Sequence, residues 1–219
     1  MNVFDIIGPV MIGPSSSHTA GAVRLGRVAW KVLGENPVRA KIALAGSFAQ
    51  TYKGHGTDKA LIAGIMGMNS YDENIRCALE LADERGLVYE FRKACMPDAH
   101  PNTARIHLYG EHGAEAVVEG ASIGGGNILV DKVNGMDVAF TGQYNTIMVR
   151  HYDRPGAIAA VTNFMAYSDV NIGNFRLSRL RKGGEAIMTI EIDGNPPKHL
   201  IEQLKMLPHV INVIMLKAM

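Results

Sequence analysis

The sequence predicts an α+β fold in two domains: an N-terminal α+β domain with a mostly antiparallel sheet, and a C-terminal domain with the element order βαββαβ. The length of 219 residues suits two domains of ordinary size. Helical spacing dominates the first part of the chain and strand patterns fill 87–140, after which a polar, turn-rich stretch at 141–145, TGQYN, precedes a pattern that starts again. We therefore expect domains over residues 1–141 and 142–219.

The N-terminal domain is expected to begin with helices. Apolar residues at helical spacing predict a helix over 19–33, whose start is a serine-rich loop. A short strand over 39–48 should end in a glycine turn. A second helix follows, capped by Thr57 or Asp58, and a third covers 72–85.

The stretch 87–140 predicts the sheet of the first domain. Its segments alternate or run apolar between Gly and Asn turns, which is typical of antiparallel strands. Within it, Ser122 and the three glycines at 124–126 are interpreted as a bend between two strands.

Residues 146–219 read as strand, helix, strand, strand, helix, strand. The expected ranges are 146–152, 153–168 with Pro155 in the first helical turn, 170–180, 185–192, 196–207 and 210–216. A four-stranded antiparallel sheet with two helices on one face is the compact solution for this order, because each helix must bury its apolar stripe against the sheet.

Composition narrows the classes of function. Hydrophobic residues make up 47% of the chain, and 22 Lys plus Arg against 21 Asp plus Glu leave a net charge of +1. With no basic block and few aromatic residues, nucleic acid and membrane surfaces are not expected as partners. The start MNVFDIIGPV lacks the pattern of an export signal, so a cytoplasmic chain is expected. Cys77 and Cys95 have no CxxC spacing and are expected to be buried free thiols.

The stretch GPSSSHTAGA at residues 13–22 is the strongest candidate site. It places hydroxyl groups where a helix begins, and the exposed N–H groups there favour a carboxylate such as that of an amino acid. The candidate substrate-binding residues are Ser15, Ser16, Ser17 and Thr19. A serine that merely caps the helix accounts for the same pattern.

Two histidines are the candidate catalytic residues. His18 lies among the serine-loop hydroxyls and titrates near neutral pH, so it suits a general base or a positioning group. His55 lies between Gly54 and Gly56, which permit an unusual backbone path. A histidine that only makes surface hydrogen bonds is the alternative for each.

The other histidines give weaker evidence for a functional site. A turn before a strand explains the cluster at 100–103 as well as a site does, so this cluster stays outside the catalytic set. Five further histidines show no ligand spacing, and no metal site is expected on this chain. They are His107, His112, His151, His199 and His209.

The βαββαβ unit resembles an ACT domain, a small ferredoxin-like regulatory module that binds amino acids. The motifs are DRPG at 153–156 and VNIGN at 170–174. The resemblance implies an effector site and pairing of sheet edges between subunits, hence a homodimer through this domain. The effector-binding candidates are Asp153, Pro155, Gly156, Asn171, Ile172 and Gly173. An ordinary helix start and strand entry are the alternative.

The N-terminal motifs resemble the β chain of bacterial iron–sulfur L-serine dehydratases. They are FDIIGPVMIGPSSSHTAGAVRLG, GSFAQTYKGHGTDKALIAGIMG, HPNTARIHL and ASIGGGNI, in order over residues 3–128. In that family a separate α chain holds a [4Fe–4S] cluster whose open iron polarises the serine hydroxyl, and L-serine becomes pyruvate and ammonia. A cluster takes about three or four thiolates, so this chain alone should be inactive and should act with an α chain.

The same domain also resembles a domain of some phosphoglycerate dehydrogenases. The alternative function is therefore a stand-alone amino-acid-binding regulatory protein without catalysis.

Overall fold

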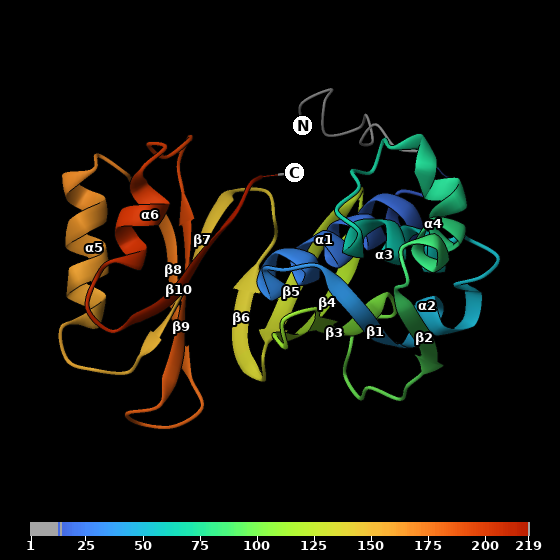
Figure 1. Cartoon of the computed structure of the whole chain (residues 1–219), viewed down its shortest axis with the longest axis horizontal. Coiled ribbons are helices and arrows are strands. Elements are labelled where there is room, and N and C mark those ends of the chain that lie inside the picture. Colours follow the sequence, from blue (N-terminus) through green and yellow to red (C-terminus); the bar gives the residue numbers. More distant parts are fainter. Residues whose placement is uncertain (1–12, 14, 219) are drawn as a thin grey trace. The chain divides into compact units, whose positions relative to one another are not determined.

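The computed structural model describes residues 13 and 15–218. Residues 1–12, which hold the start MNVFDIIGPV, and Pro14 of the serine loop lie outside the described residues. Contacts divide the chain into two compact units between Asn134 and Gly135 (Figure 1). Each unit combines helices with a sheet, as expected for an α+β protein.

The helices of the first unit follow the expected order. A π-helical turn η2 (Ser16–Gly21) runs directly into α1 (Ala22–Leu33), and a 3₁₀ turn η3 (Glu73–Cys77) runs into α4 (Ala78–Glu84). Both expected helices, 19–33 and 72–85, are thus confirmed. Between them lie α2 (Gly46–Thr51) and α3 (Thr57–Ile65).

Two local expectations were wrong. The strand expected over 39–48 is β1 (Pro37–Leu44), and the residues after it form α2, because Phe48 N–H donates to the Pro101 carbonyl at 3.2 Å. Neither Thr57 nor Asp58 caps α3: the helix begins after Gly56, whose φ is 70°, and no side chain caps it.

Five strands of the first unit lie in the order β2-β1-β3-β4-β5. Besides β1 they are β2 (Val88–Lys93), β3 (Thr103–Gly110), β4 (Glu115–Gly124) and β5 (Asn127–Val133). Only β1 and β2 pair in parallel, so the sheet is mostly antiparallel, as expected. The parallel pair arises because α2, α3 and α4 lie between these two strands and return the chain to the same edge.

Helix α1 is held between the sheet and α3. It packs against β3 and β4 on one side and against α3 on another. The two helices touch through glycine: a Cβ on Gly64 would lie 2.1 Å from the Val23 carbonyl oxygen. This contact fixes the start of α1, and with it the serine loop, against the core.

The bend expected at Ser122 and 124–126 is confirmed. The pairing of β4 with β5 shifts register between Ser122 and Gly124, and the three glycines have φ values of 101°, 60° and 80°. Arg24 of α1 donates to the Gly126 carbonyl at 2.6 Å. The glycine-rich turn is therefore tied to the helix that carries the serine loop.

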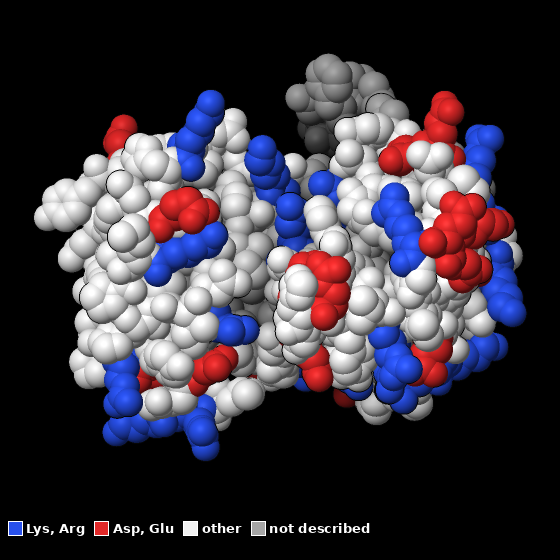
Figure 2. All heavy atoms as spheres, viewed as in Figure 1, with Lys and Arg blue, Asp and Glu red and all other residues white. Residues whose placement is uncertain are grey.

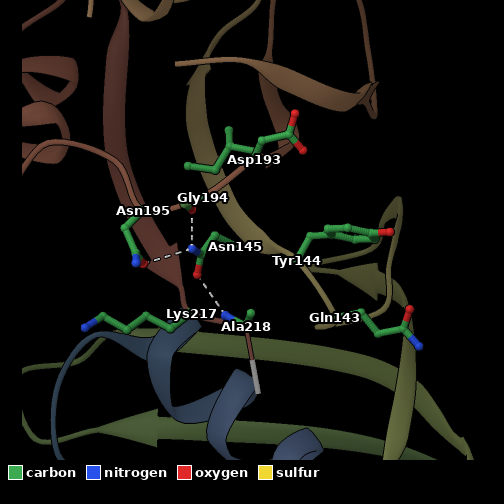
Figure 3. A pocket seen from close by; sticks show the side chains of 9 residues that line it. Gln143, Tyr144, Asn145, Asp193, Gly194, Asn195, Lys217 and Ala218 are labelled. Carbon is green, nitrogen blue, oxygen red and sulfur yellow. Dashed lines mark hydrogen bonds between the residues drawn. The ribbon is translucent and has the colours of Figure 1, made fainter. Parts of the chain in front are cut away.

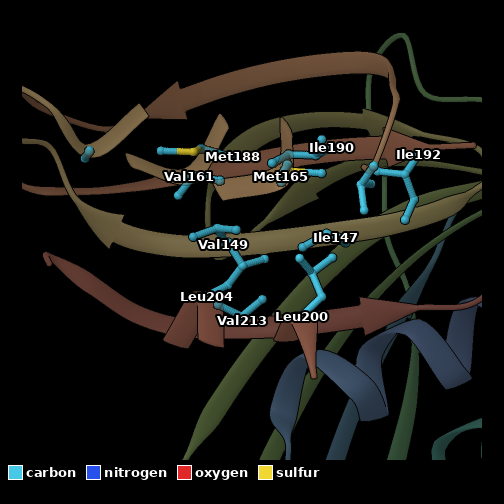
Figure 4. Packing of buried hydrophobic residues seen from close by; sticks show 12 residues of the cluster. Ile147, Val149, Val161, Met165, Met188, Ile190, Ile192, Leu200, Leu204 and Val213 are labelled. Atoms are coloured by element: carbon cyan, nitrogen blue, oxygen red, sulfur yellow. The ribbon is translucent and has the colours of Figure 1, made fainter. Parts of the chain in front are cut away.

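The second unit confirms the order βαββαβ. The elements in this order are β7 (Asn145–Tyr152), α5 (Ala157–Tyr167), β8 (Ile172–Arg179), β9 (Glu185–Ile192), α6 (Leu200–Lys205) and β10 (Val210–Leu216). The strand β6 (Met136–Phe140) precedes them and lies outside their sheet. The antiparallel sheet has the order β10-β7-β9-β8, and α5 and α6 cover one face of it with the core shown in Figure 4. The other face receives β6, which packs against β8 and β9. Pro155 was expected in the first helical turn, but α5 begins after Gly156, whose φ of 86° no helical residue adopts.

The distribution of charged side chains on the surface agrees with the nearly balanced charge of the sequence. Acidic and basic side chains are interspersed over the face seen in Figure 2. Among the described helices, none is long and apolar enough to cross a membrane. The expectation of two buried thiols was wrong, because Cys77 is half-buried and Cys95 is exposed.

Candidate functional site

The serine loop ends in a capped helix. Ser15 is the N-cap: its backbone is extended and its hydroxyl accepts from the His18 N–H at 3.3 Å. Thr19 N–H donates to the Ser15 carbonyl at 2.8 Å. The first N–H groups of a helix have no intrahelical acceptor, so this turn offers amide donors to an anion.

His18 is held by both ring nitrogens. Its ring is buried, with 9% exposed, and Nε2 lies 3.2 Å from Thr51 Oγ1 while Nδ1 lies 3.3 Å from Ser15 Oγ. Thr51 donates its own hydroxyl proton to the Ser47 carbonyl at 2.8 Å, so its oxygen is the acceptor for an Nε2 proton. Burial, and then the neighbouring His55, lower the pKa of His18. We therefore assign His18 as a neutral imidazole with its proton on Nε2.

His55 reaches the same place from a different segment. It follows α2, and its ring centroid lies 4.7 Å from that of His18. Unlike His18 it is exposed, and no hydrogen bond of its side chain occurs within the described part of the chain. The structure thus brings together the two histidines that the sequence singled out, one enclosed and one open to solvent.

The four candidate substrate-binding residues differ in their surroundings. Ser16 and Ser17 are half-buried in the first helical turn. The Ser15 hydroxyl is already engaged, because it caps the helix and contacts the ring of His18. Thr19 is 3% exposed and packs against Gly13, where an added Cβ would lie 2.3 Å from Thr19 Oγ1. Only Ser16 and Ser17 remain with hydroxyl groups open to a ligand.

Sequence reasoning missed the support that α2 gives to His18. Ser47 and Thr51 lie four residues apart on this short helix, and Ser47 Oγ is 3.5 Å from His18 Nε2. The signal was present as two hydroxyl residues at i and i+4 after a glycine. It was hidden because the segment was assigned to a strand and its turn.

The loop at 100–103 is closer to the site than expected. It supports α2, since a Cβ on Gly46 would lie 2.6 Å from the Pro101 Cα. Asn102 donates from Nδ2 to the Ser122 carbonyl at 3.4 Å, and its Oδ1 is buried without a partner within the described residues. Ser122 Oγ is likewise unpartnered there and faces Gly21 of η2. These buried oxygens are an unused polar lining behind the serine loop.

In the second unit, the first group of effector candidates lies where β7 ends. Asp153 Oδ2 accepts from Gly183 N–H at 2.9 Å and from Arg179 at 2.5 Å. The bond from Gly183, and then the one from Arg179, lower the pKa of Asp153. Pro155 and Gly156 follow it at the start of α5.

The second group lies at the opposite end of the same sheet. Ile172 pairs with Ile192, whereas Arg179, which binds Asp153, pairs with Ala186. Seven residue steps of a strand separate these ends by about 23 Å. Within one chain, therefore, Asn171, Ile172 and Gly173 cannot share a ligand with Asp153, Pro155 and Gly156.

Next to Asn171 the unit has a hollow of about 460 Å³ (Figure 3). Asn171 Nδ2 donates at 2.6 Å to Asp193, which lines the hollow. Asn145 holds its walls together, donating to the Gly194 carbonyl at 2.5 Å and accepting from the Ala218 N–H at 2.9 Å.

The cysteines do not fit an iron–sulfur cluster. Cys77 lies at the junction of η3 and α4 and Cys95 lies beyond β2, and two thiols are fewer than a cluster takes. Within residues 13 and 15–218, no group of three or more His, Cys, Asp or Glu side chains is placed to hold a metal ion.

Comparison with known proteins decides the family. The chain is 46% identical over 212 residues to the probable L-serine dehydratase, beta chain, of Bacillus subtilis, which covers 97% of this chain and 96% of the relative. The chain belongs to the family of L-serine dehydratase beta chains. The L-serine dehydratase beta chain of Peptoniphilus asaccharolyticus is 38% identical and covers 93% of this chain and 90% of its own length.

Family models agree with both halves. The serine dehydratase beta chain model matches residues 2–83 and the ACT domain model matches residues 145–209. Both resemblances seen in the sequence are confirmed. L-serine dehydratase 1 of Escherichia coli is 32% identical over 64% of this chain but only 36% of its own length, so that relative carries a large additional part.

Proposed function

We propose that this beta chain supplies the serine loop and a proton-transfer histidine to an L-serine dehydratase that converts L-serine to pyruvate and ammonia. The observation that carries the proposal is the pairing of His18 with His55 beside the helix start, at a centroid distance of 4.7 Å. The site combines an anion-binding turn with an imidazole that can take a proton.

Each part of the site has a role in this proposal. The hydroxyl groups of Ser16 and Ser17 and the free N–H groups of the turn bind the substrate carboxylate. His55 takes the α-proton, because it is exposed and its side chain has no hydrogen-bond partner among the described residues. His18 is a positioning residue, because both of its ring nitrogens are already engaged.

The partner in this proposal is an alpha chain that holds a [4Fe–4S] cluster. The beta chain names of its relatives support a second chain. The longer Escherichia coli relative supports it too, since two thirds of that protein lies outside the matched region. Cys77 and Cys95 do not fit a cluster on this chain, so it must be held elsewhere.

The test measures pyruvate release from L-serine under anaerobic conditions, for this chain alone and after co-expression with an alpha chain. We expect activity only in the complex. His55→Asn should lower kcat about 100-fold or more, whereas His112→Asn, an exposed histidine in a β-turn, should leave it unchanged. Serine binding without turnover in a complex that contains its cluster would instead make this chain a regulatory protein.

We further propose that the effector site forms between two copies of the chain. In the second unit β8 is an edge strand, and antiparallel pairing of two β8 strands would place the Asn171 end of one copy beside the Asp153 end of the other. The two groups of candidates, separated within one chain, would then face one ligand, for which L-serine is our candidate.

Mixed dimers test this arrangement. Asp153→Asn and Asn171→Ala should each abolish L-serine binding at this site in a homodimer. Mixing them should restore one of the two sites in each dimer, since that site then carries both native residues. Titration calorimetry that finds no restored binding in verified mixed dimers would contradict the shared site.

A further inference from the structure

A second hollow lies on the sheet of the first unit, away from the serine loop. It has a volume of about 310 Å³ and is lined by side chains of β1, β2, β3 and β4. Its charged and aromatic lining residues face away from the helices, because Ile42 and Ile106, which alternate with them along β1 and β3, point into the core and are at most 1% exposed. None of the residues of the serine loop or of the ACT motifs takes part in it.

Three cations surround a small floor. Ala43 of β1 pairs with Arg92 on one side and with Arg105 on the other. The backbones of the two arginines are thus about 10 Å apart, and only a methyl group lies between them. Lys41, two residues along β1, lines the same hollow.

The charges of this cluster are not all neutralised. Arg105 uses Nε for Glu119 at 2.5 Å, which leaves its terminal nitrogens for another acceptor. Lys41 is 3.8 Å from Glu90, a long and exposed contact. Arg92 forms no ion pair with any carboxylate of the described residues, although it lines the hollow beside Glu90.

One wall is rigid and carries no cation. The rings of His107 and Tyr109 stack at 4.2 Å between centroids, and the Tyr109 hydroxyl lies 3.2 Å from His107 Nδ1. Glu115 lies 3.1 Å from His107 Nε2. Since both ring nitrogens of His107 are engaged, this wall shapes the hollow rather than supplying its charge.

We propose that this hollow is a binding site for a small oxyanion, a phosphate or carboxylate group, held between Arg92 and Arg105. Guanidinium groups present paired N–H donors that match the geometry of such groups. The methyl floor of Ala43 gives the anion room to lie between them. The site is separate from the serine-binding turn, so it holds whether or not the proposed dehydratase chemistry does.

The experiment titrates the full chain with inorganic phosphate, and separately with malonate, by calorimetry at constant ionic strength. Arg92→Ala should weaken binding about tenfold or more, as expected for loss of a charge-assisted pair. The control is Lys93→Ala, which removes the same charge from the next residue of β2, on the other face of the strand. Glu90→Gln removes the carboxylate of the lining and should tighten binding.

The two ligands distinguish the source of the anion. Binding of phosphate alone points to a phosphate ester, and binding of both ligands to a site for oxyanions in general. Equal losses in R92A and K93A would mean that only the overall charge matters, and would overturn the proposal. Absence of saturable binding to the unsubstituted chain would overturn it as well.

Discussion

Replacement of Gly21 by alanine tests how the serine loop is seated on the sheet. An alanine Cβ at this position would lie 2.0 Å from Ser122 Oγ and 2.7 Å from Ser122 Cβ, but 3.6 Å from Ser122 Cα. Since carbon atoms pack at about 3.5 to 4.0 Å, the clash involves the side chain of Ser122 and not its backbone. To relieve the clash, the side chain of Ser122 or the helical turn at Gly21 must shift by about 1 Å or more within a buried region.

The magnitude follows from two opposing effects. Overpacking of this kind costs about 1–3 kcal/mol, whereas alanine in a helical turn gains about 1 kcal/mol over glycine. Gly21→Ala should therefore lower the free energy of unfolding by up to about 2 kcal/mol in the native background. In a Ser122→Gly background the clash is absent, and the same change should be neutral or stabilising.

The assay is urea unfolding followed by tryptophan fluorescence. The chain has one tryptophan, Trp30, which lies in α1 and so reports on the first unit. The four proteins of the cycle give a coupling free energy, expected at about 1–3 kcal/mol. If Gly21→Ala costs as much stability with Ser122→Gly as without it, the contact between serine loop and glycine-rich turn is not the cause.

Thr51→Val removes the hydrogen-bond acceptor of His18 Nε2 and should lower kcat about tenfold and change the pH profile of kcat. Thr51→Ser keeps the hydroxyl and should leave kcat and its pH profile unchanged. Equal losses of kcat in the two variants would contradict the positioning role of His18. Burial lowers the pKa of His18, so the unfolded chain takes up a proton first and stability should fall as pH drops below about 6.5. Urea midpoints of His18→Asn should show a weaker fall, and parallel curves would refute this assignment. Gly64→Ala, with its Cβ 2.1 Å from the Val23 carbonyl oxygen, should cost about 3 kcal/mol or more by the same fluorescence assay, while Gly54→Ala, with its nearest atom at 3.8 Å, should be tolerated.

Much of the fold was predictable because its signals are local. The amphipathic spacing that predicted 19–33 matches α1, and every element of 146–219 appears in the expected order. The errors occurred where long-range contacts override local preference. The Pro101 carbonyl accepts a hydrogen bond from the Phe48 N–H and so stabilises a helix over residues 46–51. Strand β2 pairs in parallel with β1, although its sequence suits either direction.

The candidate site was predictable in its residues but not in its geometry. The serine loop, His18 and His55 stand out in the sequence because hydroxyl, imidazole and glycine residues cluster there. Their distance of 4.7 Å and the enclosure of His18 depend on α2, which the sequence reading did not contain. Whether either histidine acts in catalysis stays a prediction.

By itself, the sequence determined the family, the α+β class and the two groups of ACT-like motifs, since these depend on residue type and spacing along the chain. Only the tertiary structure decided which groups meet. It enclosed His18, left His55 open, and separated Asp153 from Asn171 by the length of a strand. The physical reason is that burial, pKa and ligand geometry depend on neighbours far apart in sequence, which strand pairing and helix packing bring together.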